Sequence, residues 1–98
     1  EPENMPAYLI GHITVKDPDK WKTYVDGVQK SLMPFAAEIV FRGKRAAVLT
    51  GNHSYQHTVV IKFSDQQTLQ QWYHCDAYQA LIPVRDEAAD VVIVSYDA

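Results

Sequence analysis

The chain has 98 residues, a net charge of −3, 47% hydrophobic residues and 21% charged residues. This length and composition predict one globular domain over residues 5–98, and we expect the polar residues 1–4 to form a tail. The negative charge argues against a nucleic-acid partner, because phosphate binding needs clustered basic residues. No apolar run approaches the length of about 18 residues that spans a membrane. A single cysteine and the lack of a recognisable signal segment lead us to expect a cytoplasmic protein.

The first two elements are a strand and an amphipathic helix. Ala7–Val15 is rich in β-formers and apolar on both of its faces, which predicts a strand. A helix should run from Pro18 to about Met33, because Asp17 can cap it and a proline is tolerated at the first helical position. Its buried stripe is marked by Trp21, Tyr24, Val25, Val28 and Leu32.

The middle of the chain predicts a short hairpin and a further strand. Phe35–Phe41 is β-rich and leads to Arg42-Gly43-Lys44, where glycine would allow the positive φ of a tight turn. Ala46–Thr50 then returns as a short strand, and Gly51–Gln56 forms a polar loop. His57–Phe63, rich in Val and Ile, is the next strand.

The last third predicts a broken helix and a closing strand. Ser64 opens a capping box, and the helix that follows has a buried side with Leu69, Trp72 and Tyr73. After a break at His74-Cys75, Asp76 should cap a second helical segment. One face of that segment carries Tyr78, Leu81, Arg85 and Ala88. Val91–Tyr96 is the final strand.

The predicted strands carry more apolar surface than the helices of one chain can cover. Ala7–Val15, His57–Phe63 and Val91–Tyr96 have apolar residues on both faces, whereas an antiparallel sheet with one wet face alternates apolar and polar residues. The element order, β-α-β-β-β-α-β, is a variant of the ferredoxin-like βαββαβ unit. We therefore predict an α+β sandwich whose second sheet face packs against another copy of the chain, giving a homodimer.

Several segments also carry a family likeness. They are Met5–Ile10, Val15–Asp19, Arg42-Gly43, Val59–Phe63, Trp72-Tyr73 and Tyr78–Arg85. Through their order and spacing the chain resembles the domain-of-unknown-function family 1330, within the dimeric α/β-barrel superfamily, from residue 5 to about residue 96. The resemblance implies a ferredoxin-like protomer paired sheet to sheet with a second protomer, and no established reaction. Superfamily relatives include cofactor-free monooxygenases, muconolactone isomerases and haem enzymes. Ala36-Ala37-Glu38 departs from the family pattern, which commonly has Gly-Gly-Arg there.

Two arginines and a set of aromatic residues are the candidate ligand-binding residues. Arg42 and Arg85 carry planar guanidinium donors suited to a carboxylate or phosphate, and a salt bridge or a solvated head group is the alternative role of each. The aromatic set comprises Trp21, Tyr24, Trp72, Tyr73 and Tyr78. We expect Tyr24, Trp72 and Tyr78 to line a pocket for an organic acid or aromatic compound, which the resemblance implies lies between helices and sheet; plain core packing is the alternative. We expect no cofactor. The competing function is a non-catalytic dimeric interaction or regulatory module.

The histidines and the cysteine support weaker hypotheses. His53 and His57 fall across a loop and a strand start, with no acidic or cysteine ligand at a diagnostic spacing, so we expect no metal site. His12 or His74 is a candidate general base. Cys75 precedes a helix start, but adjacent helical residues point about 100° apart, so His74 is poorly placed to activate it.

Overall fold

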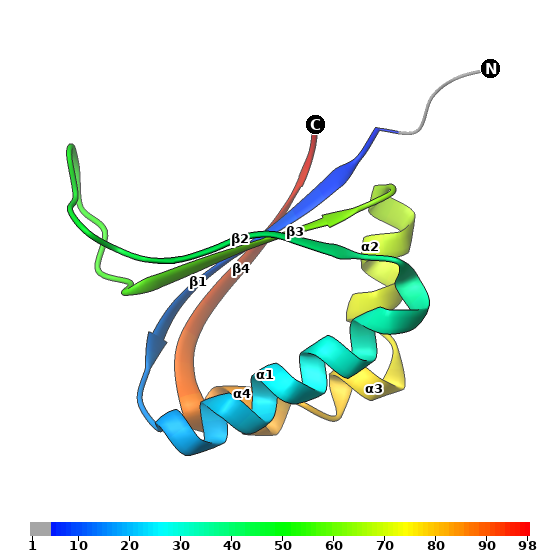
Figure 1. Ribbon diagram of the computed structural model, residues 1–98, viewed down its shortest axis with the longest axis horizontal. Coiled ribbons are helices and arrows are strands. Elements are labelled where there is room, and N and C mark those ends of the chain that lie inside the picture. Colours follow the sequence, from blue (N-terminus) through cyan, green and yellow to red (C-terminus); the bar gives the residue numbers. More distant parts are fainter. Residues whose placement is uncertain (1–4) are drawn as a thin grey trace.

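The computed structural model of the chain describes residues 5–98, so the predicted tail at residues 1–4 lies outside the described residues. The elements are β1 (Ala7–Val15), α1 (Pro18–Leu32), β2 (Glu38–Lys44), β3 (His57–Phe63), α2 (Gln66–Tyr73), α3 (Asp76–Gln79), α4 (Ile82–Ala88) and β4 (Ala89–Asp97). The four strands form one antiparallel sheet in the order β2-β3-β1-β4. All the helices lie on one side of this sheet (Figure 1). The predicted α+β, ferredoxin-like arrangement is confirmed.

Helix α1 begins where the sequence predicts. The carboxylate of Asp17 accepts a hydrogen bond from the backbone N of Lys20 at 3.2 Å, and Pro18 stands in the first turn. A 3₁₀ turn, Met33–Phe35, extends the helix, and Ala36 then adopts a left-handed φ of 53°. An alanine costs about 1 kcal/mol in this region, which glycine enters freely. The backbone at Ala36 is therefore strained in the bend between α1 and β2, and a glycine there would avoid the strain.

The predicted turn at Gly43 is wrong. This residue lies inside β2, paired with Thr58, and its φ is not positive. Its missing side chain instead permits a close approach, because a Cβ placed on Gly43 would lie 2.5 Å from Cζ of Phe41. The Phe41 ring occupies the space that a side chain at position 43 would need.

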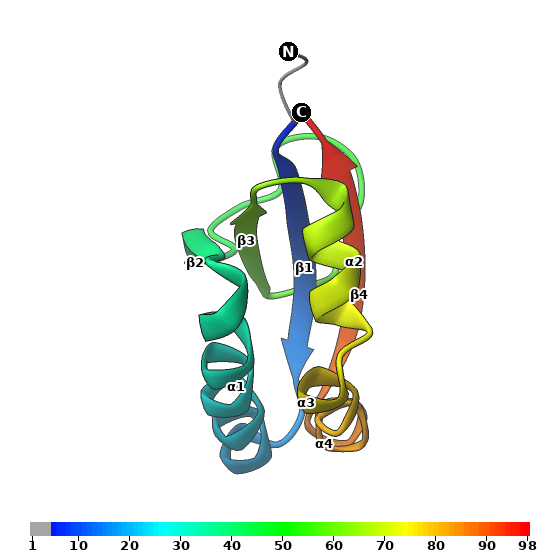
Figure 2. The ribbon, with the colours of Figure 1, turned by 90° about the vertical axis from the view of Figure 1, so that its right-hand side faces the viewer.

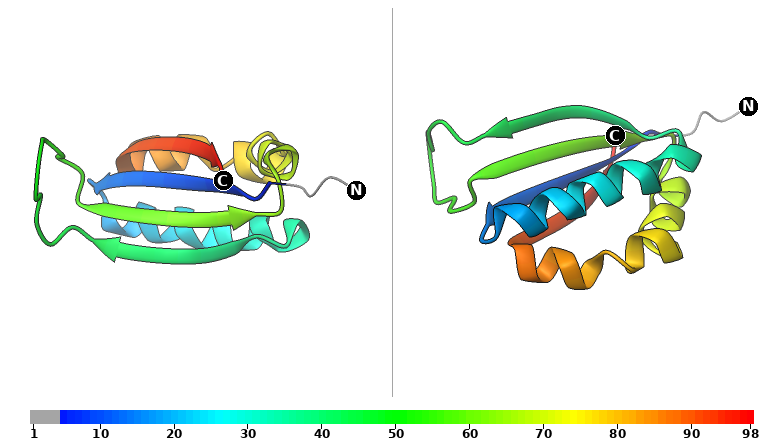
Figure 3. Two further views of the ribbon diagram at one scale, coloured as in Figure 1. Left: turned by 90° about the horizontal axis from the view of Figure 1, so that it is seen from above. Right: turned by 60° about the horizontal axis from the view of Figure 1, so that its bottom comes forward.

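The predicted strand at Ala46–Thr50 is also wrong. In the structure β2 continues to Lys44 and pairs with β3, so the strand that returns along β2 is His57–Phe63 and not Ala46–Thr50. Residues 45–56 instead form the loop of a long hairpin, and this loop projects beyond the sheet (Figure 3). A hydrogen bond of 2.7 Å from Arg45 N to the Gln56 carbonyl closes its base.

The helix starts after β3 differ in detail from the prediction. Asp65, not Ser64, caps α2: its carboxylate accepts from the Thr68 backbone N at 2.7 Å, and this hydrogen bond lowers the pKa of Asp65. The Ser64 hydroxyl lies instead 3.3 Å from the Thr68 hydroxyl. Asp76 is not a cap but the first residue of α3, which follows Cys75 without a side-chain capping bond. The predicted second segment is divided into α3 and α4, with a proline in the first turn of α4.

The inner face of the sheet, which carries Leu9, Gly11 and Ile13 of β1, packs against the helices and forms the core. Leu9 is 3% exposed and Ile13 is 4% exposed. The largest fully buried side chains are Trp72, Tyr78 and Phe63. Figure 2 shows α1 beside the run from α2 to α4, so that the two helical layers together cover this one face.

The outer face, which carries Tyr8, Ile10 and His12 of β1, has no helix on it within residues 5–98 (Figure 3). Strand register places an apolar row across the whole sheet: Phe41, Val60, Ile10 and Val94. Phe41 is 54% exposed and Val94 is 38% exposed, and β4 adds Val92 and Tyr96 at 40% and 50%. The surplus apolar face expected from the sequence is therefore present, and no described residue covers it.

Candidate functional site

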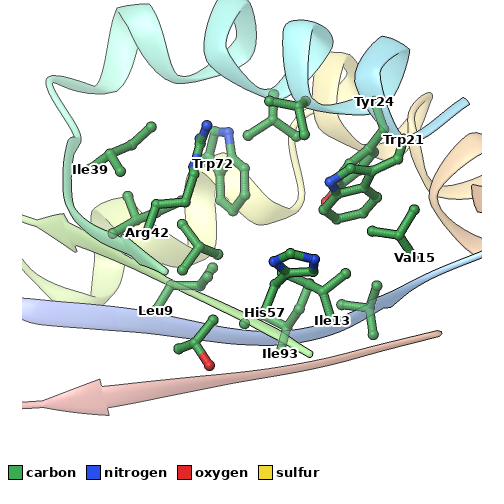
Figure 4. A pocket seen from close by; sticks show the side chains of 17 residues that line it. Leu9, Ile13, Val15, Trp21, Tyr24, Ile39, Arg42, His57, Trp72 and Ile93 are labelled. Carbon is green, nitrogen blue, oxygen red and sulfur yellow. The ribbon is translucent and has the colours of Figure 1, made fainter. Parts of the chain in front are cut away.

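A pocket of about 220 Å³ lies between α1 and the inner face of the sheet (Figure 4). Its floor consists of aliphatic side chains from β1, β3 and β4, and its roof is formed by residues of α1, including Trp21 and Tyr24. Trp72 of α2 closes one side. Small-molecule sites typically combine such apolar walls with a few placed polar groups. The volume is below the usual range of roughly 300–1,000 Å³, so a ligand would be small.

A glycine in the central strand makes room for this pocket. Gly11 belongs to a row across the inner face that also contains Arg42, Val59 and Ile93. A Cβ on Gly11 would lie 3.2 Å from Cγ1 of Val59 and 3.9 Å from Cγ1 of Ile93. Any side chain at this position would therefore stand in the pocket floor.

Two basic side chains enter the pocket from the β2–β3 side of the sheet. Arg42 pairs with Val59, and His57 stands two residues away from Val59 on β3, so the two side chains are diagonal neighbours on the inner face. Both are among the lining residues in Figure 4. Arg42 is exposed, and none of the salt bridges within residues 5–98 involves it. From the sequence, His57 is a candidate for metal ligation alone, although alternation along the strand places it on the same face as Val59.

Tyr78 and Arg85 do not line the pocket but lie behind Tyr24. The hydroxyl oxygens of Tyr24 and Tyr78 are 2.7 Å apart. Arg85 Nη1 donates to the Tyr78 hydroxyl at 3.1 Å and to the Tyr73 hydroxyl at 3.4 Å, and its Nε donates to the Asp86 carboxylate at 3.1 Å. The partner that Arg85 needs on an otherwise apolar helix face is thus found inside the chain.

Burial determines the protonation of this group. It raises the pKa of the Tyr24 hydroxyl well above its usual range, and the neighbouring Tyr78 adds to the effect. Burial also raises the pKa of Tyr78, although the hydrogen bond from Arg85 opposes the shift. Both phenols therefore keep their protons at neutral pH. Burial disfavours the charge of Arg85, but the hydrogen bonds to Tyr73 and Tyr78 outweigh it and raise its pKa.

Trp72 serves the core and the pocket together. It is 2% exposed, its ring centroid is 4.4 Å from that of Tyr78, and its ring also borders the pocket. Its Nε1 donates to the Ser31 hydroxyl at 2.9 Å, and this hydroxyl donates to the Val28 carbonyl at 2.7 Å. The indole N–H is therefore satisfied within the chain, and Trp72 offers a ligand an apolar surface.

The other histidines and the cysteine lie away from this pocket. His12 is on the outer face, 3.2 Å from the Thr58 hydroxyl through Nδ1, and its ring centroid is 4.9 Å from that of His53. His74 is exposed and Cys75 is half-buried. Within residues 5–98, no group of three or more His, Cys, Asp or Glu side chains is arranged to hold a metal ion. In the same range no helix has the length and apolar character needed to cross a membrane.

The family comparison agrees with the resemblance seen in the sequence. A family model described as domain of unknown function (DUF1330) matches residues 6–97. A comparison with curated proteins finds no match to this chain.

Solved structures of low sequence identity share the fold. A protein of unknown function from Rhodopseudomonas palustris superposes with a TM-score of 0.84 at 10% identity, over 98% of this chain and 84% of that one. SnoaB, a cofactor-independent oxygenase from Streptomyces nogalater, gives a TM-score of 0.67 at 9% identity, over 96% and 93%. A dimeric ferredoxin-like protein of unknown function from Thermobifida fusca gives 0.65 at 16% identity, over 100% and 95%. At these identities the likeness concerns the fold alone.

Proposed function

We propose, from the premise that this chain belongs to the DUF1330 family, that it is a homodimeric protein that binds a small organic acid carrying a ring. The observation that carries this proposal is the pocket between α1 and the sheet, where aromatic and aliphatic walls meet a single arginine. A ring would bury its faces against Trp72 and the aliphatic floor, and an acidic group would remain at the pocket entrance beside Arg42.

Arg42 is the anchor for the acidic group because its guanidinium has no acidic partner among residues 5–98. Its planar donors match the two oxygens of a carboxylate. Arg85, the other arginine that the sequence suggested, donates hydrogen bonds to two tyrosines and to Asp86. The binding set therefore divides into Arg42, Tyr24 and Trp72 at the ligand, with Tyr78 and Arg85 supporting Tyr24 from behind.

The binding proposal is tested with 4-isopropylbenzoate and its uncharged analogue 4-isopropylbenzamide. The benzoate should raise the melting temperature of the protein progressively as its concentration rises, since a ligand stabilises by RT ln(1 + [L]/Kd). Arg42→Gln should weaken benzoate binding by about tenfold, the worth of a charged hydrogen bond, and leave the benzamide unaffected. Arg45→Gln is the matched control, because Arg45 is exposed and bonds to the His53 carbonyl in the hairpin loop. Equal benzoate affinity in the two variants, or no binding by the wild type, would contradict the proposal.

The outer face supports the homodimer. Its row of Phe41, Val60, Ile10 and Val94 is continuous across four strands, with exposed residues at both ends and half-buried ones between them. Exposed apolar surface of this kind on a monomer is uncommon and marks an interaction site. A second copy presents the same row, and the Thermobifida fusca structure of similar fold is described as dimeric.

The dimer is tested by size-exclusion chromatography with light scattering at micromolar concentration. The wild type should have twice the mass of the chain. Val94→Lys should give a monomer, because it places a charge at the β4 end of the apolar row, whereas Gln67→Lys on the exposed side of α2 should stay dimeric. A monomeric wild type would contradict the proposed assembly.

Cofactor-independent catalysis is an extension of the binding proposal. His57 borders the pocket next to Arg42, and an imidazole can accept and return a proton near neutral pH. A structure of similar fold is a cofactor-independent oxygenase. If the ligand is turned over, His57→Gln should keep binding and abolish turnover, while His74→Gln, at an exposed position, should leave both binding and turnover unchanged.

A non-catalytic interaction or regulatory module is the second candidate function. The observation that favours it is the uncovered outer face together with the structural use of Arg85. This function predicts that the dimer forms while no ring-containing acid stabilises the protein. The melting-temperature experiment and the mass measurement together distinguish the two candidates.

A further inference from the structure

Three side chains form a hydrogen-bonded chain that leads from the solvent side of α4 to the pocket. Arg85 Nη1 is 3.1 Å from the Tyr78 hydroxyl, which is 2.7 Å from the Tyr24 hydroxyl. The Tyr24 side chain in turn borders the pocket. The direction of these hydrogen bonds determines what Tyr24 offers to a ligand.

The direction follows from the donors and acceptors available. A guanidinium can only donate, so the Tyr78 oxygen accepts from Arg85. Tyr78 is 0% exposed, and its own proton needs an acceptor inside the protein. Within residues 5–98, the Tyr24 oxygen is the acceptor at hydrogen-bond distance. Tyr78 therefore donates to Tyr24, and the proton of Tyr24 is left for another acceptor.

The pocket is where that acceptor would be. Tyr24 is 7% exposed, so its hydroxyl has little access to bulk solvent, and no further hydrogen bond of Tyr24 occurs within residues 5–98. Because burial raises the pKa of Tyr24, the proton stays on the oxygen at neutral pH. Figure 4 shows Tyr24 and Arg42 on different sides of the pocket, with the ring of Trp72 between them.

We infer that the Tyr24 hydroxyl donates a hydrogen bond to an oxygen of the ligand, and that Arg85 is a positioning residue that orients this donor through Tyr78. The inference rests on the proposed binding function and narrows its ligand class. The ligand is a small aromatic acid with a second oxygen, a carbonyl or an oxyanion, at the end of the molecule remote from the acidic group. Arg42 would hold one end and Tyr24 the other.

The chain of donors also suits a developing negative charge. Each hydrogen bond polarises the next one in a buried chain, so the positive charge of Arg85 makes the Tyr24 proton a better donor. A preorganised donor of this kind stabilises an enolate-like or phenolate-like oxygen more than a neutral carbonyl. The geometry therefore favours ligands whose second oxygen carries or acquires negative charge.

The test compares 4-acetylbenzoate with 4-isopropylbenzoate, which are similar in size; a carbonyl oxygen in the first stands where the second has a methyl group. When 4-acetylbenzoate is bound to the wild type, the infrared stretch of its acetyl carbonyl should lie at lower wavenumber than when the compound is dissolved in an aprotic solvent. Tyr24→Phe should remove this shift and lower the affinity ratio of acetyl to isopropyl probe by about threefold to tenfold, the worth of one hydrogen bond. Arg85→Met should reduce the shift without changing the affinity for the isopropyl probe, a result that a merely structural role would not produce.

A measurement on the ligand-free protein keeps the inference separate from the proposed function. With tyrosines labelled by ¹³C at Cζ, the Tyr78 hydroxyl proton should exchange slowly with deuterium and the Tyr24 proton rapidly. Equal carbonyl frequencies in wild type and Tyr24→Phe would overturn the inference and leave acid binding intact. Failure of both benzoates to bind would contradict the proposed function, and a Tyr24 proton that exchanges as slowly as that of Tyr78 would overturn the donor direction itself.

Discussion

The two faces of the sheet are similarly apolar but differ in what surrounds them. On the inner face, Leu9 and Ile61 are 3% and 4% exposed beneath the helices. On the outer face, Phe41 and Val94 are 54% and 38% exposed. The apolar content of the sheet therefore requires that both faces be covered, but the helices of this chain cover the inner face alone. Part of the inner face forms the floor of the pocket that α1 covers.

The largest expected effect separates two neighbouring residues of β1. Leu9→Ala should destabilise the protein by about 2–5 kcal/mol, because it leaves a cavity in the core. Ile10→Ala, one residue along on the outer face, should destabilise it less, and its effect should fall with dilution as the proposed dimer dissociates. Urea unfolding at two protein concentrations measures both. A concentration-independent loss of equal size at Ile10 would remove the distinction between the faces.

The two strand glycines give the next contrast. Gly43→Ala should cost about 1–2 kcal/mol, because the new methyl group lies 2.5 Å from the Phe41 ring and forces it to move. Gly11→Ala meets its nearest neighbour, Val59, at 3.2 Å, so the stability should change by less than about 1 kcal/mol. Its effect should appear instead in benzoate binding, because the methyl group enters the pocket floor. Thermal unfolding with and without the probe checks both variants; unchanged binding in Gly11→Ala would place the ligand elsewhere.

The smallest effects are expected on β4. Ile93→Val should cost about 0.5–1.5 kcal/mol and slightly enlarge the pocket, because Ile93 packs against the core and lines the floor. Val92→Thr, 40% exposed on the outer face, should change protomer stability by less than about 0.5 kcal/mol. Differential scanning calorimetry measures the loss of stability in the two variants. A larger cost at Val92 than at Ile93 in a monomeric background would contradict the assignment of faces.

Element types were predictable because they rest on local periodicity. The stripe of α1 and its Asp17 cap, the break before α3, and the strands β1 and β3 follow from residues close together in the sequence. The false strand at Ala46–Thr50 shows the limit, since local propensity does not reveal that β2 pairs with the more distant β3. The prediction of a turn at Gly43 was wrong for a similar reason, because the ring of Phe41 packs over this glycine within the strand.

The candidate site was predictable by residue type more than by geometry. Tyr24 and Trp72 line the pocket from the buried helix faces that the spacing predicts, and Arg42 lines it from β2. The sequence offered no way to separate Arg42 from Arg85, because that difference depends on the tyrosines brought near Arg85 by the packing of α3 against α1. His57 was missed as a pocket residue because the sequence, although it places His57 on the same strand face as Val59, does not show that Arg42 lies beside it there.

The central place of β1 has a consequence for the order of folding. β1 obtains its partners from β3 and β4, and Ala7 is paired with Asp97. Such pairings must close very long loops, which makes them slow relative to the helices. During synthesis, β1 therefore leaves the ribosome before both of its partner strands, and the edge that pairs with β4 stays open until residue 97 has emerged. The nascent chain should be prone to aggregation throughout that interval, and a chaperone that shields β1 should raise the yield of folded protein.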